Sequence, residues 1–201
     1  AMLPYLAEHH GNPSSVHRSG RVARAAVERA REQVAALVNA QPEQVIFTGC
    51  GTEASNLAIK GFAALHGPGR IAIGATEHPS VTAPANVLKQ AGWPLSVLPV
   101  DGQGRLVEAE TQALLKQGPQ LVSVMWANNE TGVIQDIHAL AGQVRAHGGV
   151  LHTDAVQAAG KIEVDFSASG VQLMTLAAHK LNGPKGVGAL IVDKSVELAP
   201  L

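Results

Sequence analysis

The chain has 201 residues, 46% of them apolar, and its 15 lysines and arginines nearly balance 16 aspartates and glutamates. This composition predicts one globular domain with a sizeable core and excludes an intrinsically disordered chain. The sequence has no basic excess and no apolar run near the ~20 residues that cross a bilayer, so we expect a protein that binds neither nucleic acid nor membranes. Its one cysteine cannot form an internal disulfide, which is typical of a reducing compartment, and we therefore expect a cytoplasmic protein.

Strand-like and helix-like segments alternate along the first half of the chain. Apolar residues recur at helical spacing over Ser19–Ala40, with arginines on the opposite face, which predicts an amphipathic helix. QVIFTG then predicts a strand that ends at Thr48, TEASNLAIKGFAAL predicts a helix and RIAIGA predicts a second strand. Another helix is expected from about Ser80 to Ala91.

The second half continues the alternation with helical patterns at Glu108–Lys116 and His138–His147 and with the strand-like runs PLSVLPV, LVSVMWA, VLHTDA, LMTLAA and GALIVD. Short apolar strands separated by helices are typical of an α/β fold, with a mainly parallel sheet and helices on both faces. The Gly/Pro-rich segment before GALIVD is too short for a helical crossover, so we expect the last strand to be antiparallel. Since no repeat or linker interrupts the pattern, one domain over residues 1–201 is expected.

Polar side chains follow five of these strands at their carboxyl ends, which is where ligands bind in such sheets. Packing alone does not require this pattern, and it therefore predicts a ligand site along one edge of the sheet. The five groups are Thr48 to Thr52, Glu77 with His78, Asn128 to Glu130, Asp154 with Gln157, and His179 with Lys180.

The loop GCGTE, Gly49 to Glu53, lies between a strand and a helix. Its glycines let a ligand approach the backbone, and the helix start offers free N–H groups to an anion such as a phosphate. The alternative is a helix cap made by Thr52, with no ligand involved. The loop alone leaves both interpretations open.

Two ionisable residues pose a similar choice. Asp154 either caps the next helix or pairs with a cationic ring nitrogen in the site. Lys180 either extends to solvent or acts as a neutral amine that attacks a carbonyl and forms a Schiff base. Position alone favours the extended, solvated lysine.

The combination of these signals points to pyridoxal 5′-phosphate (PLP), which requires a phosphate cradle, an acid for its ring nitrogen and an amine for an imine. His78 would then stack on the ring, and Asn129 and Gln157 would hydrogen-bond its phenolic oxygen. The individual signals are weak, but they agree on one ligand.

Six stretches of the sequence resemble the class V aminotransferase family of fold-type I PLP enzymes, and within it the cysteine desulfurases of the NifS/IscS kind. They occur in the family's order and spacing from Gly11 to about Val192, so the resemblance covers nearly the whole chain. The stretches are GNPSSVHRSG, VIFTGCGTEASNLAIKG, TEHPSV, NNETGVIQDI, HTDAVQAAGK and AAHKLNGPKGVGAL.

The resemblance implies catalytic roles for Lys180 and His78. Lys180 would hold the cofactor as a Schiff base, and His78 would stack on the ring and shuttle protons. Asp154 would pair with the pyridine nitrogen, and Gln157 would contact the phenolic oxygen.

It also implies how the phosphate and the substrate are bound. Gly51, Thr52 and His179 would hold the phosphate, and Asn129 would lie between the cofactor and the substrate carboxylate. The substrate would be L-cysteine, whose sulfur passes to a mobile enzyme cysteine and leaves L-alanine. A homodimer and a protein that accepts the sulfur, as in iron–sulfur cluster assembly, are the expected partners.

The sequence departs from the family pattern at three points. Ala177 replaces a serine that also binds the phosphate, which removes a hydrogen bond worth ~1–3 kcal/mol. The family's opening strand segment has no counterpart here, and neither does its C-terminal small domain, with the catalytic cysteine and a carboxylate-binding arginine. Cys50 is interpreted as a small residue that fills space, and no histidine has metal-ligand spacing.

We therefore expect the large, cofactor-binding domain of a cysteine desulfurase, inactive in desulfuration by itself. Two alternatives stay open. One is another class V aminotransferase or lyase, and the other is a non-catalytic, truncated homologue.

Overall fold

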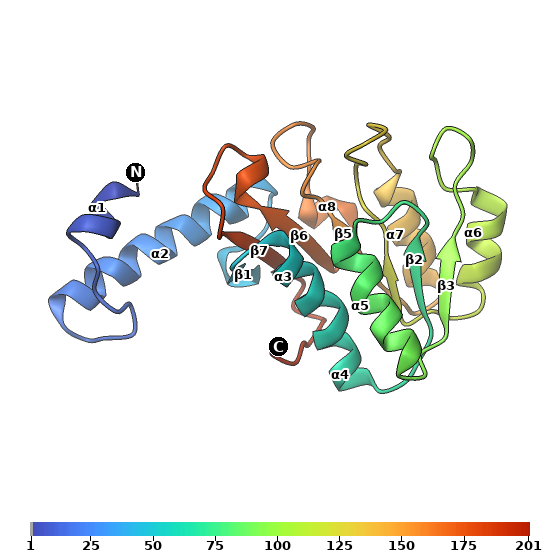
Figure 1. Ribbon diagram of the computed structural model, residues 1–201, viewed down its shortest axis with the longest axis horizontal. Coiled ribbons are helices and arrows are strands. Elements are labelled where there is room, and N and C mark those ends of the chain that lie inside the picture. Colours follow the sequence, from blue (N-terminus) through green and yellow to red (C-terminus); the bar gives the residue numbers. More distant parts are fainter. Residues whose placement is uncertain (1) are drawn as a thin grey trace.

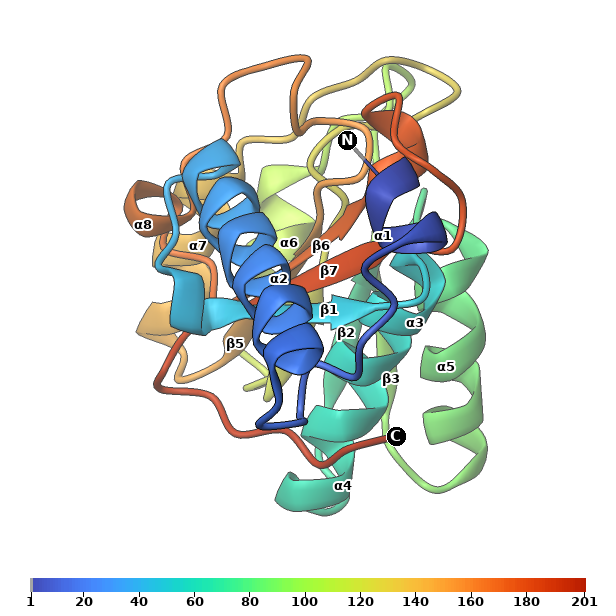
Figure 2. The same ribbon diagram turned by 90° about the vertical axis from the view of Figure 1, so that its left-hand side faces the viewer.

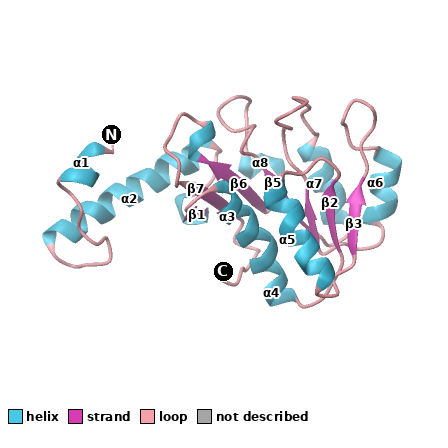
Figure 3. Cartoon of the chain, in the orientation of Figure 1, coloured by secondary structure: helices cyan, strands magenta, loops and turns pink. Residues whose placement is uncertain are grey.

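A seven-stranded sheet forms the centre of the computed structural model, which describes residues 2–201 (Figures 1 and 3). Its strands are rich in apolar residues, and most of their side chains are buried. They are β1 (Val45–Thr48), β2 (Ile71–Gly74), β3 (Leu95–Leu98), β4 (Leu121–Ser123), β5 (Val150–Asp154), β6 (Leu173–Ala177) and β7 (Gly188–Val192).

The spatial order of the strands is β1-β7-β6-β5-β4-β2-β3. The strands β3, β2, β4, β5 and β6 are parallel, whereas β7 is antiparallel to both β6 and β1. The prediction of a mainly parallel sheet with an antiparallel last strand is therefore confirmed. Because β7 runs against both of its neighbours, β1 points the same way as β6, and its carboxyl end lies at the same edge of the sheet.

Helices cover both faces of the sheet (Figure 2). On one face, α3 (Gly51–Asn56), the π-helical turn η2 (Leu57–Gly61), α4 (Phe62–His66) and α5 (Pro79–Gln90) bury an apolar cluster against the strands. On the other, α6 (Glu108–Leu115), α7 (Ile137–Ala146) and the short α8 (Phe166–Ser169) bury a second cluster. Each apolar face is thereby removed from water, which is the main stabilising contribution in such a fold.

The N-terminal part extends away from the sheet as the long helix α2 (Arg18–Leu37), with the short α1 (Leu3–Ala7) beside its far end (Figure 1). At its other end α2 packs against the edge strand β1. There the Arg31 guanidinium donates a hydrogen bond to the Val45 carbonyl and lies 5.2 Å from the centre of the Phe47 ring. This contact gives a partner to one backbone carbonyl of an edge strand. Within residues 2–201, no helix combines the length and the apolar character needed to span a bilayer.

Candidate active site

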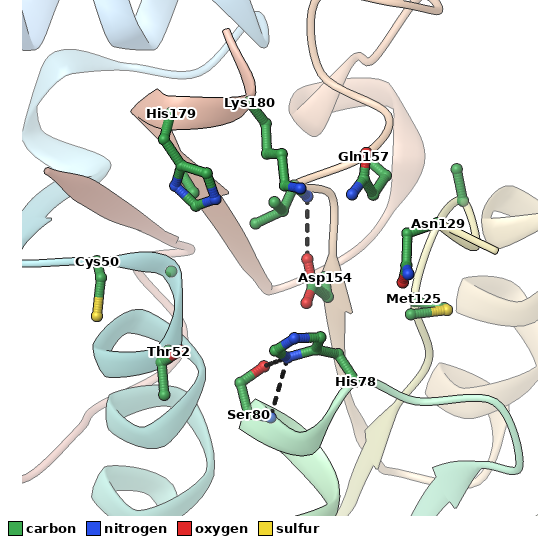
Figure 4. A pocket seen from close by; sticks show the side chains of 14 residues that line it. Cys50, Thr52, His78, Ser80, Met125, Asn129, Asp154, Gln157, His179 and Lys180 are labelled. Atoms are coloured by element: carbon green, nitrogen blue, oxygen red, sulfur yellow. Dashed lines mark hydrogen bonds between the residues drawn. The ribbon is translucent and has the colours of Figure 1, made fainter. Parts of the chain in front are cut away.

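A cavity of about 270 Å³ lies beyond the carboxyl ends of the strands, where the sequence predicts a ligand site (Figure 4). It is lined by side chains from five separate strand ends. All eight residues proposed from the sequence to bind a cofactor line it, together with six others that include Cys50, Ser80 and Ala177. The eight are Gly51, Thr52, His78, Asn129, Asp154, Gln157, His179 and Lys180.

The first wall is the turn from β1 into α3. Cys50 is the N-cap, since its Sγ accepts a hydrogen bond from the Glu53 N–H at 3.4 Å, and the Glu53 carboxylate accepts from the Gly49 N–H at 2.7 Å. Thr52 is therefore not the cap, as one interpretation of the sequence had it. Gly51 is packed closely, because a Cβ at this position would lie 3.2 Å from the Ala177 Cβ.

Asp154 ends β5 at the floor of the cavity and is 7% exposed. Its Oδ1 accepts a hydrogen bond from the Val156 N–H at 3.0 Å, so it organises a turn and caps no helix. Burial raises the pKa of the Asp154 carboxyl, an effect opposed by the Val156 N–H and by nearby His78. A buried carboxylate is costly unless a cation lies beside it.

Lys180 ends the 3₁₀ turn η3 (Ala178–Lys180), which directly follows β6. The residue is exposed, but its side chain points towards the Asp154 carboxylate (Figure 4). His179 precedes it on the same turn and also lines the cavity. An amine and a carboxylate thus meet at the centre of the site.

Gln157 lies on the turn after β5. Its Oε1 accepts a hydrogen bond from the Lys161 ammonium at 2.6 Å. This contact orients the amide, and Figure 4 shows the amide nitrogen on the side of Lys180. Gln157 therefore offers hydrogen-bond donors to a ligand oxygen.

Asn129 is carried by a loop that its neighbour Asn128 shapes. The Asn128 Oδ1 accepts hydrogen bonds from the Glu130 and Thr131 N–H groups, both at 2.9 Å, and its amide nitrogen donates to the Thr76 carbonyl at 3.3 Å. Asn128 thereby links the loop after β4 to the loop after β2. The sequence singles out Asn128 only as a polar residue at a strand end, because its partner in the other loop, Thr76, lies far away in the chain.

The loop after β2 carries Glu77 and His78. Glu77 is 8% exposed, and its Oε1 accepts a hydrogen bond from the Met125 N–H at 2.7 Å, which ties this loop to the end of β4. Its Oε2 has no hydrogen-bond partner among residues 2–201. Burial is the main cause that raises the pKa of this carboxyl well above its usual value, and nearby Asp154 adds to the effect.

His78 is the N-cap of α5. Its Nδ1 accepts a hydrogen bond from the Ser80 N–H at 3.1 Å and lies 2.9 Å from the Ser80 Oγ. Figure 4 shows the imidazole between Ser80 and Asp154. Sequence reasoning missed the role of Ser80, because the donor to His78 is a backbone N–H, which the residue type does not reveal.

A buried polar chain crosses the sheet just behind the site. His152, two residues before Asp154 on β5, lies 2.8 Å from the Ser123 Oγ through Nδ1 and 2.9 Å from the Thr175 Oγ1 through Nε2. The Ser55 hydroxyl on α3 continues the chain to Thr175 at 3.3 Å. Burial lowers the pKa of His152 to about 3, so the ring is neutral near pH 7.

The described part of the chain holds no group of three or more histidine, cysteine, aspartate or glutamate side chains placed to bind a metal ion. The polar side chains that line the cavity carry amide, amine, imidazole and carboxylate groups, and they surround the start of a helix.

Comparison with known proteins places this site in context. The model of the aminotransferase class-V family matches residues 1–201. The chain is 42% identical over its whole length to cysteine desulfurase 2 of Trichormus variabilis, of which it covers 51%. It is 45% identical over 197 residues, 96% of this chain, to the cysteine desulfurase IscS of Neisseria meningitidis, of which it covers 48%. The chain thus spans about half the length of these curated relatives.

Several solved structures have the same fold as this chain. A NifS-like protein superposes on the whole chain with a TM-score of 0.96 and 34% identity, over 56% of its own length. A structure described as SspA in complex with cysteine gives a TM-score of 0.95 with 31% identity, covering the whole chain and 59% of its own. The apo cysteine desulfurase of Thermococcus onnurineus gives 0.92 with 27% identity, over 99% of this chain and 51% of its own.

Proposed function

Because the chain belongs to the class V aminotransferase family, whose members are PLP-dependent enzymes, we propose that it is the cofactor-binding part of a cysteine desulfurase. The reaction would convert L-cysteine to L-alanine and transfer the sulfur to an enzyme cysteine outside this chain. This choice of substrate is supported by the similar proteins, one of which is a cysteine desulfurase and another of which was solved in complex with cysteine. The observation that carries the proposal is the meeting of a helix start, a buried carboxylate and an amine in one cavity.

The donor set of the cavity fits PLP. Gly51 has no Cβ, and close packing against Ala177 leaves the backbone of the α3 start as the available surface for a phosphate. Asp154 is a buried acid, and a protonated pyridine nitrogen is the kind of cation that would stabilise its charge. Lys180 supplies the amine for covalent attachment.

We assign the following tasks to residues of this chain. When bound, PLP would supply the electron sink that makes the Cα proton of an amino acid acidic. Asp154 would keep the ring nitrogen protonated, and Gln157 would donate a hydrogen bond to the phenolic oxygen. Asn129 would orient the substrate carboxylate, and His78 would lie over the ring.

The first test is covalent capture. PLP added to the pure protein should produce a visible absorbance band, and borohydride should then fix the cofactor to Lys180, as peptide mass spectrometry would report. Lys180→Ala should bind PLP without fixation, and Lys185→Ala is the matched control because it removes a nearby lysine outside the cavity. Fixation that persists in Lys180→Ala would contradict the assignment.

A second test concerns turnover. We expect this chain by itself to release no sulfide from L-cysteine above the rate of free PLP, because Cys50 is engaged as the cap of α3. Sustained sulfide release that slows in Cys50→Ala would show that Cys50 is the nucleophile. A homodimer and a sulfur-accepting protein stay proposals, and light scattering of the pure protein tests the first of them.

One observation favours a second candidate, a homologue that has lost catalysis. Ala177 lines the cavity at the position where the resembling family carries a phosphate-binding serine. A protein that neither binds PLP nor changes absorbance in the titration above would support this candidate.

A further inference from the structure

The hydrogen bonds at the start of α5 determine which nitrogen of His78 carries a proton. Pro79, the first helical residue, has no N–H, and the Val81 and Thr82 N–H groups both donate to the His78 carbonyl, at 2.9 and 3.2 Å. Ser80 lies between Pro79 and Val81 in the sequence, and its N–H donates to the His78 Nδ1 at 3.1 Å. The N–H groups of Ser80, Val81 and Thr82 at the start of the helix therefore all have a partner on His78.

This contact has a definite chemical consequence. A backbone N–H can only donate, so the His78 Nδ1 must present a lone pair. A neutral imidazole carries one proton, which then resides on Nε2. Figure 4 shows this second nitrogen on the opposite edge of the ring, towards Asp154 and the cavity.

We propose that His78 works as a neutral Nε2–H hydrogen-bond donor to the anionic groups of an amino-acid ligand in the cavity, and that Ser80 is the positioning residue that holds this tautomer. The inference rests on the proposed function for the identity of the ligand. It differs from the expectation that His78 shuttles protons, because a proton taken up by the ring would have to enter at Nδ1 and break the bond from the Ser80 N–H.

The Ser80 hydroxyl, 2.9 Å from Nδ1, marks the competing arrangement. It could accept a hydrogen bond from a protonated Nδ1, but the Ser80 N–H would then lose its partner within a site where Ser80 is 4% exposed. Removing the hydroxyl while keeping the N–H therefore strengthens the preference for the Nε2–H form. Ser80→Ala is the variant that makes this distinction.

The first experiment reads the tautomer directly and needs no cofactor. Protein labelled with ¹⁵N-histidine is measured at neutral pH by long-range ¹H–¹⁵N correlation, with His78 assigned from the signals lost in His78→Asn. We expect an unprotonated Nδ1 and a protonated Nε2, in the parent and in Ser80→Ala alike. A protonated Nδ1 in either protein would overturn the proposal, whatever the outcome of the PLP titration.

The second experiment follows exchange of the Cα proton of L-alanine in D₂O with PLP-loaded protein, which needs no nucleophilic cysteine. In His78→Gln the amide nitrogen replaces the Nε2–H donor without basicity, whereas His78→Ala removes it. If His78 is a hydrogen-bond donor, the exchange rate should fall less than ~10-fold in His78→Gln and clearly more in His78→Ala. Equal losses of ~100-fold or greater in both variants would identify His78 as a general base and refute the inference.

Discussion

Ala177→Ser tests the phosphate cradle by adding one hydroxyl to it. Ala177 ends β6, is 3% exposed and faces the cavity, and its Cβ lies 3.2 Å from where a Cβ on Gly51 would be. A serine hydroxyl at this position would project beside the start of α3, where we propose that the phosphate binds. It would also restore the residue found in the resembling family.

The expected gain follows from the strength of a hydrogen bond to a charged group. Such a bond contributes ~1.5–3 kcal/mol, so the dissociation constant for PLP should fall roughly 10- to 100-fold. Without the ligand, the new hydroxyl is buried beside apolar neighbours and costs ~1–3 kcal/mol if it finds no partner. The variant should therefore unfold more easily than the parent without PLP and recover the difference when PLP is bound.

The assay is a titration followed by visible absorbance, run with PLP and with pyridoxal, which lacks the phosphate. Ala177→Val adds volume without a donor and serves as the matched control. The gain should be confined to Ala177→Ser with PLP. An equal gain with pyridoxal, or no change with PLP, would refute the phosphate placement at the start of α3.

Two buried groups give predictions about pH. Since the pKa of His152 is lowered to about 3 from its usual 6.5, the protein should lose up to ~5 kcal/mol of stability as the pH falls from 6.5 towards 3. His152→Gln should lose less stability than the parent between pH 7 and pH 4, as measured by denaturant unfolding at both pH values. An unchanged slope in His152→Gln would contradict this. Glu77 has a raised pKa, so the stability from its neutral form is present below pH 4.5 and lost as the pH rises through the folded-state pKa. Glu77→Gln, which keeps the acceptor for Met125, should therefore gain stability relative to the parent as the pH rises from 5 to 8, and a constant difference would contradict the raised pKa of Glu77.

The repeating patterns of the sequence were sufficient to predict the elements of the sheet. Strands and long helices lie within a few residues of their expected bounds, as with α2, because periodicity over many residues averages out local exceptions. The short helices α1 and α8 were not predicted, since five and four residues carry too little periodic signal. The π-helical turn η2 was also missed, because apolar spacing does not reveal where one extra residue enters a turn.

The site was predictable to the extent that the carboxyl ends of parallel strands meet at one edge. That geometry alone brings Thr52, Asp154 and Lys180 together from distant parts of the chain. The sequence could not reveal that Cys50 caps α3 or that Ser80 fixes the ring of His78. Both depend on backbone angles and on pairings within turns, which no residue pattern specifies.

The position of β7 bears on how the chain assembles. Val45 in β1 pairs with Ile191 in β7, so the strand that leads into the glycine turn joins the sheet only after β7, far later in the sequence, has been synthesised. Until then the nascent chain has to keep an apolar N-terminal strand from misassociating, and closing so long a loop slows folding. β7, which follows the turn that carries Lys180, thus joins β1 and the glycine turn to β6, so these two sides of the cavity are placed relative to each other only once β7 has paired with both strands.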